Sequence, residues 1–256
     1  MKYRIKSKDF FAREEENGAL SLIVEGNNRI LFFNRMARRL LTRCDEWVDL
    51  AAFVRELGVT DVPQETVYRD FEKLLYKLEA DELAELCDLP QPEGTGVRTA
   101  DYRDARHVSE FLLANADAGF SCAVSVNPAY NALPGVYTRM QNGVEQSLLS
   151  EQAGAVCGLL TVSLPAKLSG NSAAILQSAV FPAQTPQAAC VHQLASLLDY
   201  AATIYAAAYS KLRYVYMNDR QNALRDALVT LGFGETALLP NEVRGGRDMI
   251  LYDRML

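Results

Sequence analysis

The stretch AAILQSAVFPAQTPQAACVHQLASLLDYAATIYAAAYSKLRYVYM, residues 173–217, decides the fold of the C-terminal part of this chain. Its first run, residues 173–181, is apolar and β-prone and is stopped by Pro182. Apolar residues then recur at three- and four-residue spacing, as one face of a helix over residues 186–209 requires. The run 212–217 predicts a second strand. A strand, helix, strand unit of this kind joins parallel strands through a right-handed crossover.

The flanking segments extend this unit into a domain. Downstream, Leu224, Leu228 and Leu231 form a second helical stripe, and Gly232 follows as the residue best able to take the left-handed conformation that ends a helix. Phe233 is expected to return to the core, and residues 248–255 to form the closing strand. Upstream, the predicted elements are a strand at 98–102, a helix at 103–116, short helix within 128–141, and a hairpin of strands 144–152 and 154–165.

This order of elements, over residues 97–256, resembles the GCN5-related N-acetyltransferase (GNAT) family. The resemblance implies an α+β domain with a mixed, mostly antiparallel sheet flanked by helices. It also implies acetyl-CoA as co-substrate and transfer of its acetyl group to a primary amine. The family binds the CoA pyrophosphate on backbone amides at the start of the helix after the fourth strand. The residues whose amides would hold CoA in this chain are Val180, Gln187, Ala188, Ala189, Cys190 and Val191. Asn222 is also assigned to CoA, and it lies one place after Gln221, which replaces the asparagine that usually opens the family's last helix.

Two departures from the family's pattern bear on catalysis. The family's phosphate loop carries glycines, whereas residues 181–194 here contain none and have alanines at 188 and 189. The family's usual tyrosine general acid, five residues before Phe233, is replaced by Leu228. Tyr216 is then the candidate proton donor to the leaving thiolate, with core packing as its alternative role. A catalytically degenerate GNAT fold that serves as a peptide- or protein-binding scaffold is the alternative to an enzyme.

The N-terminal part reads as a separate domain. The segment DLPQPEGTGV, residues 88–97, packs two prolines and two glycines between apolar-periodic segments, so we expect domains at 1–90 and 97–256. Residues 19–34 predict two strands joined at residues 26–28. Helices are predicted at 34–44, 48–57 and 64–87. Three helices and a hairpin in this length are a winged-helix composition.

The details of this region resemble the PqqD family, whose members recognise leader sequences of ribosomally made peptides. The resemblance lies in residues 32–34 (FFN), Ala37, residues 40–41 (LL) and the turn 45–47 (DEW). It implies that a peptide or protein acceptor adds a strand to the hairpin edge. DNA binding, the other use of a winged helix, is disfavoured because the third helix is more acidic than basic. A basic cluster is either a solvated helix face or a site for an acidic peptide: Arg35, Arg38, Arg39 and Arg43.

Composition limits the remaining classes. With 49% hydrophobic and 23% charged residues and a net charge of −6, the chain has the balance of a folded protein and no basic half for nucleic acid. No apolar run reaches the ~20 residues of a bilayer span, and the first residues lack the apolar core of a secretory signal. Five dispersed cysteines indicate reduced thiols, so we expect a cytoplasmic protein. With two histidines, no metal site is predicted.

Overall fold

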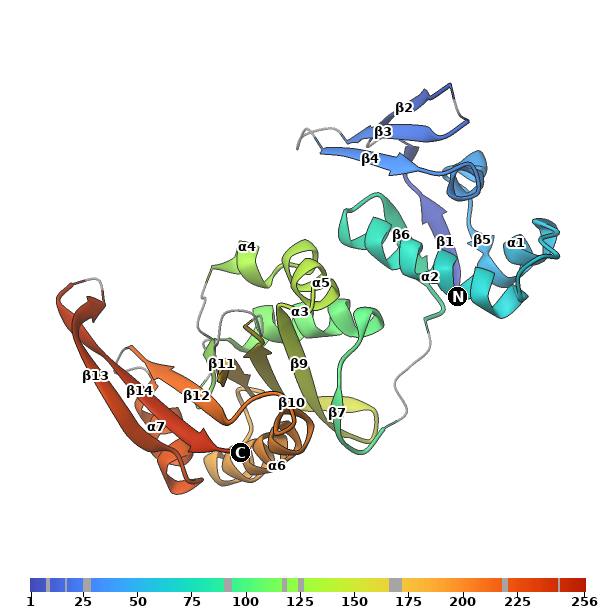
Figure 1. Ribbon diagram of the computed structural model, residues 1–256. Coiled ribbons are helices and arrows are strands. Elements are labelled where there is room, and N and C mark those ends of the chain that lie inside the picture. The colour runs from blue at the N-terminus through green and yellow to red at the C-terminus, as the bar shows by residue number, and fades with distance from the viewer. Residues whose placement is uncertain are drawn as a thin grey trace. The chain divides into compact units, whose positions relative to one another are not determined.

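A computed structural model describes residues 1–7, 10–16, 18–24, 29–89, 94–116, 119–123, 127–165, 172–217, 221–243 and 245–256. The chain divides into two compact units, Met1–Gln91 and Pro92–Leu256. The division falls inside the segment 88–97, in which the sequence concentrates proline and glycine. Figure 1 shows the elements of each unit.

The first unit contains two three-stranded antiparallel sheets. One has the order β5-β1-β6, from β5 (Val48–Asp49), β1 (Lys2–Ile5) and β6 (Ala84–Cys87). The other has the order β2-β3-β4, from β2 (Phe10–Glu14), β3 (Leu20–Val24) and β4 (Arg29–Phe33). The predicted pairing of the strands within 19–34 is confirmed, because Leu20 faces Phe33 and Val24 faces Arg29. The predicted turn at residues 26–28 lies outside the described residues.

The helices of the first unit differ from the prediction in two places. The first is a 3-10 helix, η2 (Ala37–Arg43), and the second is α1 (Leu50–Glu56), capped by the Asp49 side chain, which accepts from the Ala52 amide at 2.8 Å. The third, α2 (Gln64–Ala80), ends seven residues before the predicted end at 87. Glu82 takes a left-handed φ of 64°, which breaks the helix, and the chain then pairs with β1 as β6. The prediction of helix over residues 84–87 was therefore wrong.

The second unit is built on one eight-stranded mixed sheet, which confirms the expected α+β class with a mixed sheet. Its order is β13-β14-β12-β11-β10-β9-β7, and the short β8 pairs with β11 off this path. Only the pair β11–β12 is parallel among the strand pairs of the described residues. The strands are β7 (Gly96–Thr99), β8 (Cys122–Ala123), β9 (Glu145–Gln152), β10 (Ala155–Ser163), β11 (Ala173–Val180), β12 (Lys211–Tyr216), β13 (Gly234–Val243) and β14 (Arg247–Met255).

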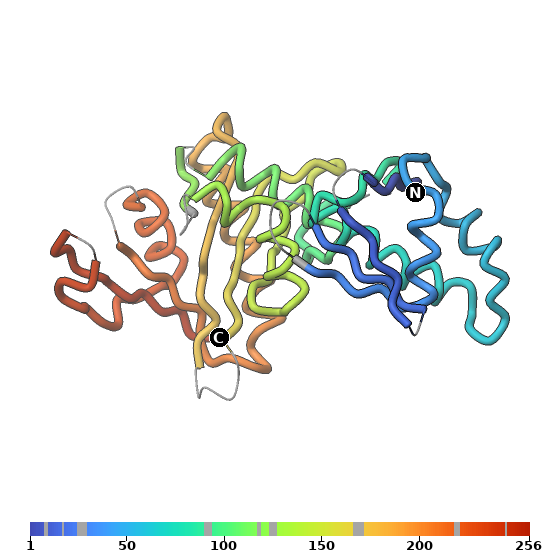
Figure 2. The backbone as a smooth tube through the Cα atoms, turned by 90° about the horizontal axis from the view of Figure 1, so that it is seen from above, coloured from blue at the N-terminus to red at the C-terminus, as the bar shows by residue number. Residues whose placement is uncertain are grey.

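Helices cover both faces of this sheet. Figure 1 shows α3 (Ala105–Asn115), α4 (Pro128–Asn131) and α5 (Leu133–Gln141) on one side and α6 (Gln187–Tyr205) and α7 (Asn222–Thr230) on the other. A 3-10 turn, η3 (Tyr102–Asp104), leads into α3. The largest apolar cluster lies between the sheet and the pair α6 and α7. In Figure 2 the long strands β10 and β11 run side by side through the middle of this unit.

Most of the predicted elements of this unit are present. The hairpin turns at Ala153 and Gly154, with φ values of 50° and 79°, and Gly232 ends α7 with a φ of 93°. Phe233 is buried, as expected. Two strands were not predicted, β8 and β13. β13 shows no two-residue alternation of buried and exposed side chains, because nearly all of its residues are exposed and, among the described strands, it pairs with β14 alone.

Candidate functional site

The centre of the second unit is the place where β11 and β12 separate. These parallel strands pair from Ala173 with Lys211 to Leu176 with Tyr214, and no further. Gln177 follows as a bulge in the pairing of β11 with β10. Beyond it, β10 continues to pair with β11 as far as Val180, whereas β12 continues only with β14. After Leu176, β12 therefore no longer pairs with its edge of β11.

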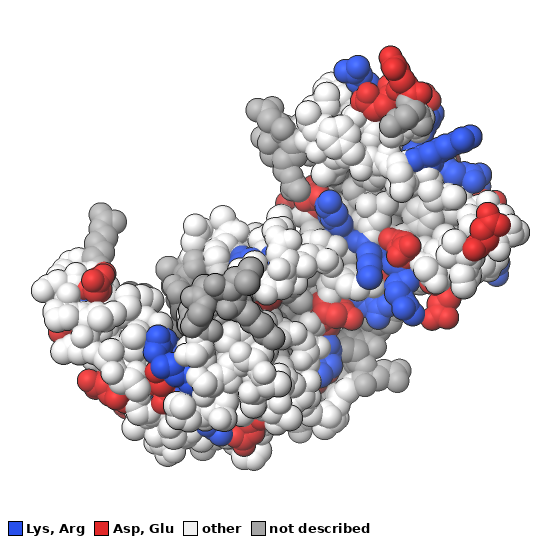
Figure 3. Space-filling model, in the orientation of Figure 1, with Lys and Arg blue, Asp and Glu red and all other residues white. Residues whose placement is uncertain are grey.

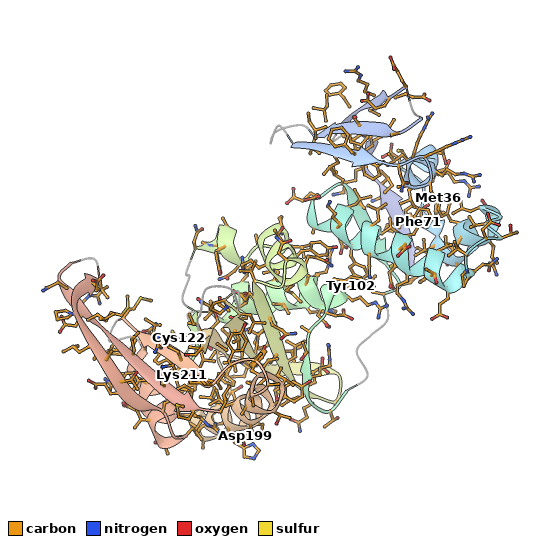
Figure 4. The ribbon with its side chains drawn as sticks, viewed as in Figure 1. Met36, Phe71, Tyr102, Cys122, Asp199 and Lys211 are labelled. Carbon is orange, nitrogen blue, oxygen red and sulfur yellow. The ribbon has the colours of Figure 1, made fainter. Side chains whose placement is uncertain are left out.

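The chain itself fills that edge. β8 pairs antiparallel with β11, with Cys122 facing Ala179 and Ala123 facing Ser178. Because β10 holds the other edge of β11 along this length, β8 lies on the edge that β12 leaves. Ser121 extends the contact, since its hydroxyl accepts from the Phe181 amide at 2.8 Å and donates to the Phe181 carbonyl at 2.9 Å. Figure 4 labels Cys122 among the strands of this unit.

The start of α6 lies just beyond β11. Pro186 precedes the helix, and its carbonyl accepts from the Ala189 and Cys190 amides at 2.9 and 3.0 Å. Gln187 and Ala188 are the first two helical residues, so helical geometry gives their N–H groups no partner within the helix. The macrodipole adds partial positive charge at this end, which favours an anion. Gln187 and Ala188 are exposed to solvent.

A cavity of about 250 Å³ opens at this helix start. It lies between the end of β11, the start of α6, the first turn of α7 and the segment before β8. No Lys or Arg is among the described residues that line it. The lining residues are Gly119, Phe120, Phe181, Pro182, Ala183, Thr185, Gln187, Cys190 and Ala223.

A second cavity, inside the separation of β11 and β12, is far smaller. Its volume is about 10 Å³, the room of about one water molecule. Tyr214 and Leu228 line it together with Cys122 and the β11 residues Ser178 and Ala179. Burial, and then the neighbouring Cys122, raise the pKa of the Tyr214 hydroxyl, so it keeps its proton at neutral pH. Leu228, where the family usually has a tyrosine, thus lines the same small cavity as Tyr214.

The other tyrosine of β12 has a defined partner. The Tyr216 hydroxyl donates to the Asn222 side-chain oxygen at 2.6 Å, so the structure brings together two residues that the sequence analysis selected separately. The Arg225 guanidinium lies 5.0 Å from the centre of the Tyr216 ring. Tyr216 is only 8% exposed, whereas Asn222, at the start of α7, is exposed. Tyr216 is therefore held in one orientation near the surface of the unit.

The structure disperses the rest of the predicted set. Of the seven residues assigned to CoA, only Gln187 and Cys190 line the larger cavity. Cys190 is buried, and burial raises the pKa of its thiol. Val180 is also buried and faces Leu159 of β10. Ala188, Ala189 and Val191 lie in the first turns of α6.

Three residues of the site were missed by the sequence analysis. Cys122 belongs to β8 and Ser121 directly precedes it, and the β-prone run FSCAVSV, residues 120–126, was the signal that could have revealed this strand. Gln221, buried at the start of α7, donates to the Cys122 sulfur at 3.0 Å and accepts from the Met217 amide at 3.0 Å. Nothing in the spacing of Gln221 distinguishes it from a surface residue.

The described residues hold neither a cluster of metal ligands nor a helix that could cross a membrane. No group of three or more His, Cys, Asp or Glu side chains there is arranged to hold a metal ion. Among the same residues, no helix combines the length and apolar character that crossing a bilayer demands.

Comparisons with known proteins give structural similarity only. No protein-family profile matches the chain, and no curated protein sequence matches it. One similar solved structure is the ribosomal L7/L12 alpha-N-protein acetyltransferase RimL in complex with coenzyme A, with 15% identity and a TM-score of 0.48 over 65% of this chain and 97% of that one. Another is the ribosomal-protein-S5-alanine acetyltransferase of Vibrio fischeri, with 14% identity and a TM-score of 0.46 over 62% and 91%. A spermidine N-acetyltransferase of Vibrio cholerae has 18% identity and a TM-score of 0.46 over 62% and 92%.

Proposed function

We propose that the second unit is an acyl-CoA-dependent N-acyltransferase of the GNAT type, acting with acetyl-CoA on a primary amine. The observation that carries the proposal is the separation of the parallel pair β11 and β12 directly beside the start of α6. The edge of β11 that β12 leaves can pair with an extended ligand that contains amides, and the CoA arm contains two; in this structure β8 holds that edge. The cavity of about 250 Å³ at the helix start offers room for the phosphate end of such a ligand.

Backbone amides at the start of α6 can bind the CoA pyrophosphate even though the family's glycines are missing there. The Gln187 and Ala188 amides point out of the first turn of α6, and the helix dipole favours a pyrophosphate there. Alanine leaves a backbone amide accessible at small steric cost. Ala189 and Cys190 already give their amides to Pro186, so the anion would be held at the first two residues of the helix.

The reaction needs positioning more than covalent catalysis. The neutral amine nitrogen forms a bond to the thioester carbonyl carbon, the carbon–sulfur bond breaks, the amine loses one proton, and the CoA thiolate takes up one. Holding the two reactants in contact supplies much of the rate. In this proposal the Tyr216 hydroxyl exchanges its bond to Asn222 for one to the leaving thiolate and donates its proton there, and Tyr214 is a second hydroxyl at the separation.

The test is CoA binding by calorimetry, followed by thiol release from acetyl-CoA with a panel of amines and basic peptides. Ala223 lines the cavity at the start of α7, so Ala223→Trp should fill it and abolish CoA binding. Val229→Trp is the matched control, because Val229 is exposed on the same helix and does not line the cavity. Equal CoA affinity in the two variants would show that CoA does not bind in this cavity.

One observation favours a second function, a catalytically degenerate GNAT fold that binds a peptide or protein as a scaffold. The separation of β11 and β12 is occupied by β8, and Leu228 stands beside it where the family usually has a tyrosine. Binding of CoA without thiol release above the uncatalysed rate, for every acceptor in the panel, would favour the scaffold. Release with any acceptor would favour the enzyme.

For the first unit we propose a PqqD-like winged-helix role in recruiting the peptide acceptor. Among the described strands, β2 and β4 of its second sheet each pair on one side, with β3, so each offers an edge for an added strand. Phe11, Ile23 and Ile30 are cross-strand neighbours on one exposed face of this sheet. Arg38 and Arg43 pair with Glu14 and Glu56, which supports a solvated helix face rather than an acidic-peptide site.

The charge pattern agrees with a peptide partner. Figure 3 shows Lys and Arg side chains of the first unit interspersed with Asp and Glu rather than gathered in one basic area. Extended apolar peptides should bind the first unit, and Phe32→Ser, on β4 and 76% exposed, should weaken them. Peptide binding is measured by fluorescence anisotropy. Unchanged affinity in Phe32→Ser would argue against peptide binding on this face.

A further inference from the structure

The short segment 120–123, which includes β8, is bound to the edge of β11 that β12 leaves. β11 has two edges, and β10 occupies one of them from Ile175 to Val180. On the other edge, β12 pairs as far as Leu176, and β8 takes over at Ser178 and Ala179. The edge exposed by the separation of the parallel strands is therefore already hydrogen-bonded to the chain's own residues.

Side chains reinforce the backbone pairing of this segment. The Ser121 hydroxyl bonds both the amide and the carbonyl of Phe181, at 2.8 and 2.9 Å, in a buried setting. The Phe120 ring meets the Phe181 ring edge to face, with centroids 5.6 Å apart. Gln221 donates to the Cys122 sulfur from the opposite side, at the start of α7. The segment is thus held by β11 and by the beginning of α7.

The volumes of the two cavities show how little room β8 leaves at the strand separation. Outside the segment, at the start of α6, there is about 250 Å³, and Gly119 and Phe120 form part of its wall. Inside, at the separation itself, there is about 10 Å³, lined by Cys122, Ser178 and Ala179. One water molecule fits in the inner space, and a thioester with its acyl group does not. A ligand that reaches the separation has to move β8.

We propose that β8 is a self-occluding strand that competes with the acyl-CoA arm for the exposed edge of β11. This rests on the proposed function, because it assigns regulation to the same site. With β8 paired, the nucleotide end of CoA has room at the start of α6, but the thioester has no path to Tyr214 and Tyr216. With β8 displaced, the amides of β11 are free to bond the arm.

The consequence for affinity follows from competition. When only a fraction of the molecules has β8 displaced, the apparent dissociation constant rises by the inverse of that fraction. Anything that weakens the pairing of β8 with β11 therefore tightens CoA binding. Anything that fixes the pairing weakens CoA binding, because only the nucleotide end then has room. This direction is unusual, because removing native contacts next to a ligand site ordinarily weakens binding.

The decisive experiment is a reversible covalent lock. Cys122 faces Ala179 directly in the antiparallel pair, and such pairs have Cα atoms ~4.5–5.5 Å apart, within the range of a disulfide. Ala179→Cys in the full chain can therefore be oxidised to join β8 to β11, with the bond verified by thiol counting in mass spectrometry. The reduced form of the same variant is the control. The double variant Cys122→Ser, Ala179→Cys controls for the oxidant.

We expect the oxidised variant to bind CoA at least ~100-fold more weakly than its reduced form, by calorimetry. In the second arm, Ser121→Ala removes both bonds to Phe181 and should tighten CoA binding by about tenfold. Ser196→Ala is the matched control, because the Ser196 hydroxyl donates to the His192 carbonyl of its own helix in an exposed setting, and this variant should leave the CoA affinity unchanged.

The outcomes separate the two proposals. Equal CoA affinity in the oxidised and reduced variant, or weaker binding in Ser121→Ala, overturns the self-occluding strand while the CoA site stands. Absence of CoA binding in the wild type, in the reduced variant and in Ser121→Ala overturns the proposed function and this inference with it. Loss on oxidation with gain in Ser121→Ala supports the inference.

Discussion

Replacing Asp253 by Asn should destabilise the second unit and remove a defined part of its pH dependence. Asp253 lies on β14 opposite Arg213 of β12, and its carboxylate accepts from the Arg213 Nε and Nη2 atoms at 2.8 Å each. Lys211, labelled in Figure 4, adds a third contact at 2.8 Å. The Asp253 side chain is only 3% exposed, so solvent screens these pairs little. They fasten β12, one wall of the strand separation, to β14.

The magnitude follows from the pKa. Burial alone would raise the pKa of Asp253, but the hydrogen bonds and charges of Arg213 and Lys211 outweigh it and lower the pKa from its ordinary 3.8 to about 2. Since one pKa unit corresponds to ~1.4 kcal/mol, the charged form is stabilised by ~2.5 kcal/mol in the folded state. A pKa that is lower in the folded state adds stability above about pH 4. That stability is lost as the pH falls toward 2.

The assay is urea unfolding followed by far-UV circular dichroism, for wild type and Asp253→Asn, from pH 7 to pH 2.5. We expect a loss of ~2–3 kcal/mol at pH 7 that shrinks below pH 4, because Asn does not titrate. Asp199→Asn is the matched control: Asp199 accepts from Arg254 at the same 2.8 Å but is 69% exposed, so its loss should stay below ~1 kcal/mol. Figure 4 labels Asp199.

The single Trp of the chain, Trp47, lies in the first unit and gives an independent signal. Its fluorescence transition should be the same in wild type and Asp253→Asn if the units unfold separately. Equal losses in the Asp253 and Asp199 variants, or a loss in Asp253→Asn that does not change between pH 7 and pH 2.5, would refute the argument from burial and pairing.

Three further predictions concern catalysis, packing and domain organisation. Tyr216→Phe should lower acetyl-transfer turnover by ~100- to 10,000-fold with unchanged CoA affinity, and Leu228→Tyr should raise it; unchanged turnover in Tyr216→Phe, measured by thiol release, would exclude Tyr216 as proton donor. Gly158→Val should cost ~1–3 kcal/mol in urea unfolding, because a Cβ at Gly158 would already lie 3.0 Å from the buried Phe181 ring, and a neutral effect would show that this ring can move. Fragments 1–91 and 92–256 should each fold, with proteolysis of the full chain starting within 88–97; first cleavage elsewhere, or an unfolded 1–91 fragment, would contradict this.

The helical and strand periodicities were sufficient where one face of an element is buried. The stripe of α6 from Leu194 to Tyr205 is buried against the sheet, as its spacing predicted. The apolar stripe of α7 was predicted for the same reason, because Leu224 and Leu228 are buried. The prediction over residues 84–87 failed because a helix-compatible sequence, with Leu83 and Ala84 buried, is held instead as a strand by pairing with β1. Such competition between local preference and long-range pairing is invisible in a short window.

The site was predicted less completely than the fold, and for a related reason. A run of backbone amides at a helix start can be located from Pro186 and the apolar stripe that follows it, so Gln187 and Cys190 were found. The contact of Tyr216 with Asn222 joins two residues chosen for separate reasons. Ser121 and Gln221 carry polar groups whose value depends on partners at Phe181 and Cys122, which are distant in sequence. No local pattern encodes those partners.

By itself, the sequence determined most of the strands and helices of the second unit and the position of the α6 start, and it indicated a break near residues 88–97, because each depends on residues close together in the chain. The tertiary structure alone decided which strand occupies the free edge of β11. Two hydrogen-bonding edges are available on every strand, and the choice among β12, β8 and an external ligand depends on groups that folding brings together. Because β8 occupies that edge, the candidate site includes Ser121 and Cys122 in addition to the alanines of α6.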